Sequence, residues 1–228
     1  MLPAARYQLN GTRVPDRFVD NTGASLRLAI FGGTGRTGRV VIEHAVRHGH
    51  EVNALTRDPA RINPRPQLHV VGGDVRDPAA VARTLDGADA IISTLGRQRR
   101  GPDICTEGIR TVLLTADGDG PHRLIILSNY GVADSRRRTA YVAASWLLER
   151  AVLRDKEQME SLVRDSDTDW TVIRAPVLTN GSRTGNYRTG TDLRLSLTAK
   201  VSRADLAAFM LTELREKVYP RRAVVITS

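Results

Sequence analysis

Three glycines with regular spacing offer the first sign of chemistry in this sequence. Gly32, Gly35 and Gly38 follow an apolar run with GxxGxxG spacing and lead into a segment of helical periodicity. In that context the first glycine permits a tight turn, the second lets the backbone approach a diphosphate, and the third lets the helix pack closely on the strand. Phosphate oxygens would accept hydrogen bonds from free N–H groups at the helix N-terminus. The spacing predicts a dinucleotide site, and the alternative is a glycine-rich turn without a ligand.

The end of the next apolar run indicates which dinucleotide would bind. A site for NAD usually places a carboxylate there to accept hydrogen bonds from the ribose hydroxyls. This sequence has Thr56 and Arg57 at that point, with Arg61 one helical turn later. Two guanidinium groups suit a 2′-phosphate and favour NADP(H) as the cofactor. Asp58 leaves another interpretation open, as the acidic residue one position late, although a role in capping the short turn that follows is favoured.

Apolar runs that alternate with segments of helical periodicity must position these residues. The expected strands cover residues 26–31, 51–56, 68–73, 89–96, 123–128, 169–176 and 221–227, and the expected helices cover 40–49, 77–85, 106–118, 140–165 and 205–214. Strands that are apolar throughout, each followed by a helix, belong in a parallel sheet covered on both faces. The pattern predicts an α/β fold, a single doubly wound Rossmann sheet over residues 26–228.

Two segments fall outside this alternation. Residues 1–25 mix both charge signs and lack the apolar core of a secretory signal, so we expect an extension that precedes the fold. Residues 177–192 are too polar for a core and too long for a plain connection. They are predicted to form a substrate-binding loop at the nicotinamide end of the cofactor. Tyr187, within this loop, could either pack or touch substrate.

The composition limits the classes of protein to consider. With 228 residues and 41% hydrophobic content, the chain can build one sizeable core. Its single cysteine, Cys105, cannot form an internal disulfide and is expected to fill apolar space rather than act as a nucleophile. Since no apolar stretch approaches the roughly 20 residues of a membrane span, we expect a cytoplasmic protein with no membrane partner. No metal site is predicted.

The charge of the chain raises the question of nucleic acid. The formal net charge is +9, and all but three of the 34 basic residues are arginine. Basic runs occur only at residues 97–100 and 136–138, where loops are expected, and no aromatic residues interleave with them to stack bases. This distribution argues against nucleic-acid binding and favours a solvated basic surface.

Several motifs together resemble a known family. They are FGGTGRTG, LTRDPAR, VVGGDVRD, ISTLG, the strand end at Ser128 and the late segment VSRADLAAFML. This set is similar to the atypical short-chain dehydrogenase/reductases, in the NmrA-like branch that includes biliverdin-IXβ reductase/flavin reductase. The likeness runs from about residue 26 to residue 228 and is stronger in the cofactor half. It implies a Rossmann fold and NAD(P)H binding.

The resemblance also implies which residues meet the cofactor. Three residues of the glycine turn would contact the diphosphate, two after the third strand would flank the adenine, and the fourth strand would end beneath the cofactor. Together with the residues predicted above, the implied cofactor-binding set is Gly32, Thr34, Gly35, Arg36, Thr37, Gly38, Arg57, Arg61, Asp74, Val75, Thr94, Leu95, Gly96, Ser128, Pro176 and Val177.

The catalytic half departs from the pattern of ordinary short-chain dehydrogenases. These use a tyrosine and a lysine in YxxxK spacing, which occurs nowhere in this sequence. Ser128 matches the serine that biliverdin and flavin reductases keep beside the nicotinamide, although those enzymes have a histidine where Val177 stands. Lys156 falls where many NmrA-like proteins point a side chain toward the nicotinamide. We therefore predict Ser128, Lys156 and Tyr130 as catalytic residues. The alternatives are a strand-end serine, a solvent-facing lysine paired with Asp155 and a packed tyrosine.

The combined prediction is an NADPH-dependent oxidoreductase. It would transfer hydride to a small, planar conjugated substrate such as a flavin, a quinone or an enone. One alternative is a non-catalytic NADP(H)-binding sensor, which the missing YxxxK dyad would fit. Another is an isomerase or cyclase that uses the bound cofactor without net redox change. A small-molecule substrate is the expected partner, and the protein is expected to be a monomer or a homodimer.

Overall fold

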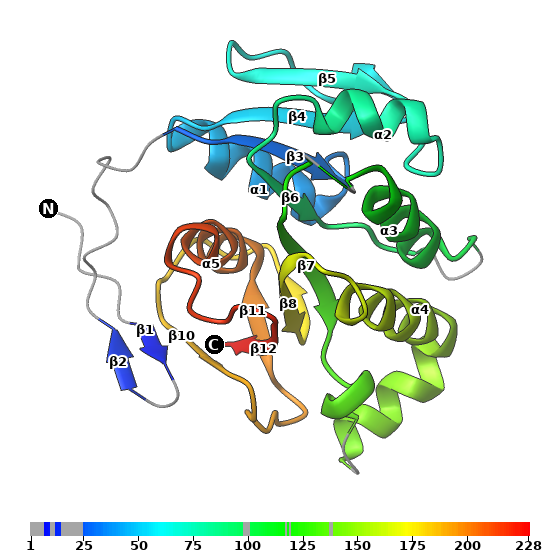
Figure 1. Ribbon diagram of the computed structural model, residues 1–228. Helices are drawn as coiled ribbons and strands as arrows, with labels where there is room; N and C mark the ends of the chain where they lie inside the picture. Colours follow the sequence, from blue (N-terminus) through cyan, green and yellow to red (C-terminus); the bar gives the residue numbers. More distant parts are fainter. Residues whose placement is uncertain are drawn as a thin grey trace, which may run out of the picture.

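A ten-stranded sheet forms the centre of the computed structural model (Figure 1). The structure describes residues 7–9, 12–14, 25–97, 101–116, 118, 120–136 and 139–228. The strands are β1 (Tyr7–Leu9), β2 (Thr12–Val14), β3 (Arg27–Phe31), β4 (Glu51–Thr56), β5 (Leu68–Gly72), β6 (Ala90–Ser93), β7 (Arg123–Asn129), β8 (Asp169–Ala175), β9 (Val177–Thr179), β10 (Tyr187–Gly190), β11 (Lys200–Ser202) and β12 (Arg222–Thr227). The helices are α1 (Arg36–Arg47), α2 (Pro78–Leu85), α3 (Ile104–Thr115), α4 (Ala140–Arg164) and α5 (Arg203–Glu216), with short 3₁₀ helices η1 (Pro59–Arg61) and η2 (Ala133–Ser135).

The strand order identifies the fold. The sheet runs β2-β1-β10-β12-β8-β7-β6-β3-β4-β5, and every neighbouring pair from β12 to β5 is parallel. The chain moves outward from β3 to β5 and then returns to the other side of β3 with β6. This reversal confirms the predicted doubly wound α/β fold. Ligands bind in such folds outside the carboxyl ends of the strands at the reversal point, here between β3 and β6.

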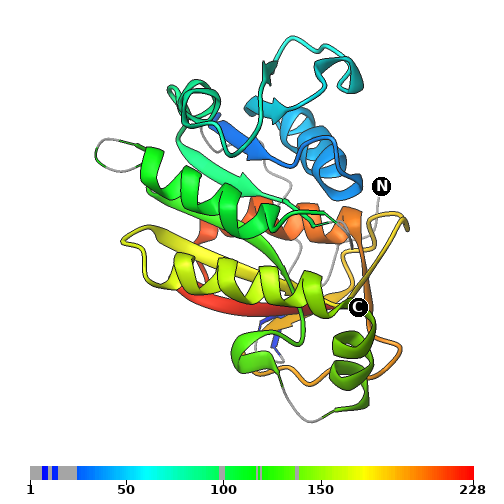
Figure 2. The ribbon, with the colours of Figure 1, turned by 90° about the vertical axis from the view of Figure 1, so that its right-hand side faces the viewer.

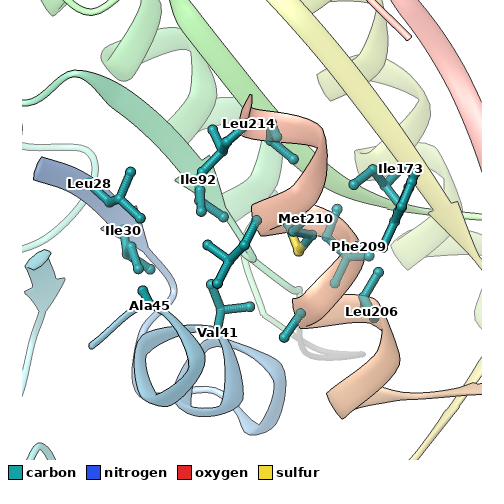
Figure 3. Packing of buried hydrophobic residues seen from close by; sticks show 14 of the residues in the cluster. Leu28, Ile30, Val41, Ala45, Ile92, Ile173, Leu206, Phe209, Met210 and Leu214 are labelled. Atoms are coloured by element: carbon teal, nitrogen blue, oxygen red, sulfur yellow. The ribbon is translucent and has the colours of Figure 1, made fainter. Parts of the chain in front are cut away.

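Alternate residues of the central strands enter two separate cores. In β3, Leu28 and Ile30 pack with α1 and α5, whereas Ala29 and Phe31 pack with α2, α3 and α4. Figure 3 shows the first core, where side chains of α1 and α5 meet those of the strands. Figure 2 shows α3 and α4 side by side on the other face. Because both faces are buried, the strands read as continuous apolar runs.

The first helix starts earlier than its apolar pattern predicts. It begins at Arg36 rather than at residue 40. The backbone N–H of Arg39 already donates to the carbonyl of Gly35 at 3.0 Å, so helical hydrogen bonding begins within the glycine turn. The apolar periodicity starts only at Val40, so the glycine spacing, and not the periodicity, predicts the first turn of this helix.

The expectation of a long segment without regular structure at 177–192 is wrong. This segment contains β9, which pairs with β11, and β10, which joins the main sheet antiparallel to β12. Tyr187 is buried and packs edge-on against Phe209, with ring centroids 5.9 Å apart. The segment before residue 25 also contributes strands, because β1 pairs with β10 and β2 pairs with β1 at the edge of the sheet.

Helix α4 has two halves with different surroundings. Thr139 caps its N-terminus, and Glu149 interrupts the helical backbone with φ −130° and ψ 27°. The half that follows packs against α3 and carries Met159 and Val163 into the core. The half that precedes packs in a smaller cluster around Tyr130 and Val142. Among the described residues, no helix has the length and apolar character to cross a membrane.

Candidate active site

A large cavity lies along the carboxyl ends of the central strands. Its volume is about 1080 Å³, and its walls come from the turns after β3, β4, β5 and β6, the ends of β7 and β8, and parts of α4 and α5. All the residues implied as cofactor-binding line it except Gly38. Residues that the sequence predicted, from segments spread over about 150 residues, thus line a single cavity.

The glycine turn has the geometry expected of a phosphate cradle. Gly32 has φ +84°, and a Cβ there would lie 2.8 Å from the backbone carbon of Thr94. A Cβ on Gly38 would lie 2.2 Å from the carbonyl oxygen of Gly32, so this glycine serves helix packing rather than the cavity wall. Gly35 is the N-cap of α1, where no side chain caps the helix and the first turn carries no acidic residue. The first N–H groups of α1 are thus free of a side-chain cap, as anion binding requires.

The end of β4 presents basic rather than acidic side chains to the cavity. Arg57 and Arg61 are exposed and line it, and Asp58 does not. Thr56 Oγ1 donates to the carbonyl of Asp58 at 3.1 Å and accepts from its N–H at 3.1 Å. The predicted capping role of the Asp58 side chain is wrong, because that side chain makes no hydrogen bond to η1.

Asp74 supplies a fixed carboxylate after β5. It accepts hydrogen bonds from the Nε and Nη2 of Arg76, at 2.9 and 3.0 Å, and from the backbone N–H of Arg76 at 3.0 Å. The side chain of Arg76 lowers the pKa of Asp74 to about 2. The carboxylate is therefore ionised at neutral pH and can act there only as a hydrogen-bond acceptor.

Two adjacent residues of α4 hold the floor of the cavity in place. Asp155 is buried and accepts hydrogen bonds from the N–H groups of Cys105 and Thr106, at 3.1 and 2.8 Å, at the start of α3. Lys156 Nζ donates to the carbonyls of Leu95 and Leu127, at 2.7 and 2.6 Å. Only 3% of Lys156 is exposed, which excludes a solvent-facing lysine. Two of the three N–H donors of the ammonium thus bind backbone, which leaves one for a ligand.

Ser128 and Tyr130 lie close in sequence but in different surroundings. Ser128 lines the cavity at the end of β7 and is 2% exposed, and its Oγ has no hydrogen-bond partner among the described residues. Tyr130 is buried away from the cavity and packs edge-on against Tyr141, with ring centroids 5.7 Å apart. The structure brings Ser128 and Lys156 to the same cavity and does not bring Tyr130 there. We assign Tyr130 a packing role.

Sequence reasoning missed several lining residues at the end of the cavity away from Arg57. Tyr141 lies in the first turn of α4, and burial raises the pKa of its hydroxyl, which stays protonated. Leu148 and Leu197 line the cavity with 64% of each side chain exposed, and Val177 with 56%. Exposed apolar side chains around a cavity are typical of a site for an apolar ligand. Val177 was among the predicted residues, whereas Tyr141 and Leu148 of α4 and the distant Leu197 share no local motif that could have revealed them.

The charges around the cavity favour an anionic ligand. Six cationic side chains and two carboxylates line it: Arg36, Arg57, Arg61, Arg97, Lys156 and Arg203, with Asp74 and Glu149. A concave surface with this excess of positive charge attracts phosphates.

The single cysteine does not provide a nucleophile. Cys105 is fully buried, and burial raises the pKa of its thiol to about 11. The thiol stays protonated at neutral pH, in agreement with the predicted filler role. The described residues contain no cluster of His, Cys, Asp and Glu that could hold a metal ion.

Comparisons with known proteins agree with this geometry. A model of the NAD(P)H-binding family matches residues 32–217, and the chain belongs to that family. The reductase pytE from Aspergillus terreus is 26% identical over 257 residues, which cover 88% of this chain and 97% of pytE. The uncharacterized protein YwnB from Bacillus subtilis is 24% identical over 215 residues, 89% of this chain and 99% of YwnB.

A solved structure supports the fold. ChuY, an anaerobillin reductase from Escherichia coli O157:H7, matches with a TM-score of 0.76 at 24% identity, over 88% of this chain and 96% of ChuY. The sequence resemblance is thus confirmed at the level of family and fold. The chain is an NAD(P)H-binding protein with the fold of known reductases.

Proposed function

We propose that this member of the NAD(P)H-binding family is an NADPH-dependent reductase of a small, planar conjugated substrate. The observation that carries the proposal is the continuity of the cavity. One cavity joins the glycine turn of α1 and the basic pair after β4 to the exposed apolar side chains of Leu148, Val177 and Leu197, which we call the apolar chamber. The hydroxyl of Ser128, which has no hydrogen-bond partner among the described residues, lies in the cavity wall. A nucleotide and an acceptor would therefore lie in contact.

Residues of this chain fit the cofactor at each of its parts. The uncapped start of α1 would hold the diphosphate, because its N–H groups need an acceptor. Arg57 and Arg61 would hold the 2′-phosphate of NADPH, and no acidic side chain at the end of β4 lines the cavity to repel it. Asp74 would accept a hydrogen bond at the adenine side. When bound, NADPH would supply hydride to the acceptor.

The chamber would favour reaction through the hydrogen-bond donors in its wall. Negative charge that develops on the acceptor needs a nearby donor, and donors placed in advance stabilise it most. Ser128 Oγ is such a donor, because its hydroxyl has no partner among the described residues. Lys156 would act mainly by fixing the carbonyls of Leu95 and Leu127 beneath the nicotinamide. Leu148 and Leu197 would cover the apolar face of the acceptor.

The test is NADPH oxidation with a panel of flavin, quinone and enone acceptors. We expect at least one planar acceptor to consume NADPH in equal amount, and NADH to react less efficiently. Turnover that leaves NADPH unconsumed would support the isomerase or cyclase alternative instead.

One observation favours a second candidate, a non-catalytic NADP(H) sensor. Two of the three ammonium donors of Lys156 are occupied by backbone carbonyls, and Tyr130 lies outside the cavity. These placements leave the chamber with few free proton donors. Tight NADPH binding without oxidation by any acceptor of the panel would favour the sensor.

A further inference from the structure

Arg203 is a buried cation that faces the cavity with little compensation. It is the first residue of α5, lines the cavity and is only 8% exposed. Its Nη1 donates to the side-chain oxygen of Asn180 at 2.7 Å, and Asn180 is neutral. Its Nε has no hydrogen-bond partner within the described part of the chain.

Two acidic groups, Asp205 on α5 and Asp74 on the cavity wall, are engaged with groups other than Arg203. Asp205 accepts from the N–H groups of Thr184 and Gly185, at 2.8 and 2.7 Å, and from the hydroxyl of Ser202 at 2.7 Å. Asp74, one of the two carboxylates on the cavity wall, is bonded to Arg76. Burial and the positive charge of Arg36 both lower the pKa of Arg203.

A buried cation without a counter-ion is costly for a folded protein. Arg36 is the first residue of α1, and Arg203 is the first residue of α5. The two helices pack against each other, and Figure 3 shows the buried side chains between them. Both line the same cavity, and Arg36 lies at the glycine turn. An anion at this turn would lie beside both guanidinium groups and would offset their mutual repulsion.

We propose that Arg203 binds the diphosphate of the dinucleotide from the side opposite the glycine turn, so that Arg36 and Arg203 hold it between α1 and α5. The inference rests on the proposed binding of NADP(H). On this proposal, α5 contributes a contact to the diphosphate in addition to those of the glycine turn, and so raises the affinity for the cofactor. Since the diphosphate is common to NADPH and NADH, Arg203 would serve both, in contrast to Arg57.

The experiment is to titrate NADPH and NADH against the wild-type protein and Arg203→Met. We expect the affinity of the variant for both dinucleotides to fall about tenfold or more. This is the loss expected when one hydrogen bond to a charged group is removed. The ligand-free variant should melt at the same temperature or higher, because it loses a buried and poorly compensated charge. NADP⁺ should raise its melting temperature less than that of the wild type.

Two further variants make the result specific. Arg110→Met removes the same charge from an exposed position on α3 outside the cavity, and its affinities should match the wild type. Arg203→Lys keeps the charge and should recover part of the lost affinity.

Three outcomes would overturn the inference. Unchanged affinity of Arg203→Met for both dinucleotides would show that Arg203 does not meet the cofactor, while wild-type binding would leave the proposed function intact. A raised KM for carboxylate-bearing acceptors with unchanged dinucleotide affinity would assign the anion to the substrate. Failure of the wild type to bind either dinucleotide would overturn the proposed function and this inference with it.

Discussion

The proposed preference for NADPH would depend on single side chains after β4. Arg57→Ala should weaken NADPH binding by about tenfold, since a hydrogen bond to a charged group contributes roughly 1.5 to 3 kcal/mol. Binding of NADH, which lacks the 2′-phosphate, should stay nearly unchanged. Titration of both cofactors measures the difference. Arg65→Ala, at an exposed arginine outside the cavity, is the matched control. Equal losses for both cofactors would remove the 2′-phosphate role of Arg57.

Ser93, on the neighbouring strand β6, provides a matched control for a substitution of Ser128 on β7. Ser93 is also a buried serine without a hydrogen-bond partner among the described residues, but it does not line the cavity. With a confirmed acceptor, Ser128→Ala should lower kcat by about 10²-fold or more and leave NADPH affinity within about threefold. Ser93→Ala should leave kcat unchanged. If the two variants turn over equally, Ser128 does not act on the reaction.

Lys156 should affect stability as well as turnover. Lys156→Met would remove the ammonium donor from the carbonyls of Leu95 and Leu127, and would leave the first with only the weak thiol donor of Cys105. We expect a loss of about 2 to 6 kcal/mol in the free energy of unfolding, because each of the two buried carbonyls left unpaired costs roughly 1 to 3 kcal/mol. Urea unfolding monitored by circular dichroism measures it. A variant as stable as the wild type would show that the lysine does not hold these two strand ends.

At the scale of elements, the glycine turn and α1 fit together with little tolerance. Gly38→Ala would place a Cβ 2.2 Å from the carbonyl oxygen of Gly32 and should displace α1 from the turn. We expect it to lower both the melting temperature and NADPH affinity. Gly49→Ala is the comparison, because Gly49 has φ +80° with open space around it. Its cost should be about 1 kcal/mol, without an effect on NADPH affinity. Equal effects of the two variants would contradict the packing role of Gly38.

An element could be predicted from the sequence when its own residues carry a local pattern, and could not when it depends on distant partners. The central strands were predictable because burial on both faces gives continuous apolar runs, as in β3, β6 and β7. Strand β10 reads YRTG and carries no such run, and it forms because β12 and β1 offer backbone partners from distant segments. Pairing of this kind leaves no local pattern in the sequence.

The same distinction applies to the candidate site. The glycine turn and the ends of β4 and β6 were predictable because each is a local motif next to a strand. Arg203 and Leu197 reach the cavity only through the path of the chain from β9 to α5. The prediction of Tyr130 as a catalytic residue was wrong because only its backbone follows β7, whereas its side chain packs toward α4.

At the scale of the whole molecule, stability should depend on pH through His50. This histidine is buried, and its Nδ1 accepts a hydrogen bond from the N–H of Leu26 at 3.1 Å. Burial, with the charge of Arg215, lowers its pKa from 6.5 to about 4. The unfolded chain therefore binds the proton more readily. The contribution of His50 is fully present above pH 6.5 and is lost as the pH falls through about 4.

This loss can be measured directly. The free energy of unfolding should fall by up to about 3 kcal/mol over that range through His50 alone. Urea unfolding at a series of pH values would show it, and His50→Gln should flatten the profile in the same range. A wild-type profile that the substitution leaves unchanged would mean that His50 titrates normally in the folded protein.

The interruption of α4 at Glu149 separates two tasks within one helix. The half that follows is fixed by Asp155, Lys156 and the buried ion pair between Glu160 and Arg174. The half that precedes supplies Tyr141 and Leu148 to the cavity and packs in its own small cluster. Relatives could therefore diverge in the molecules they accept by changing two helical turns, while cofactor binding and the main core are inherited intact. The evolutionary freedom of this fold would be concentrated in the segment from Tyr141 to Leu148.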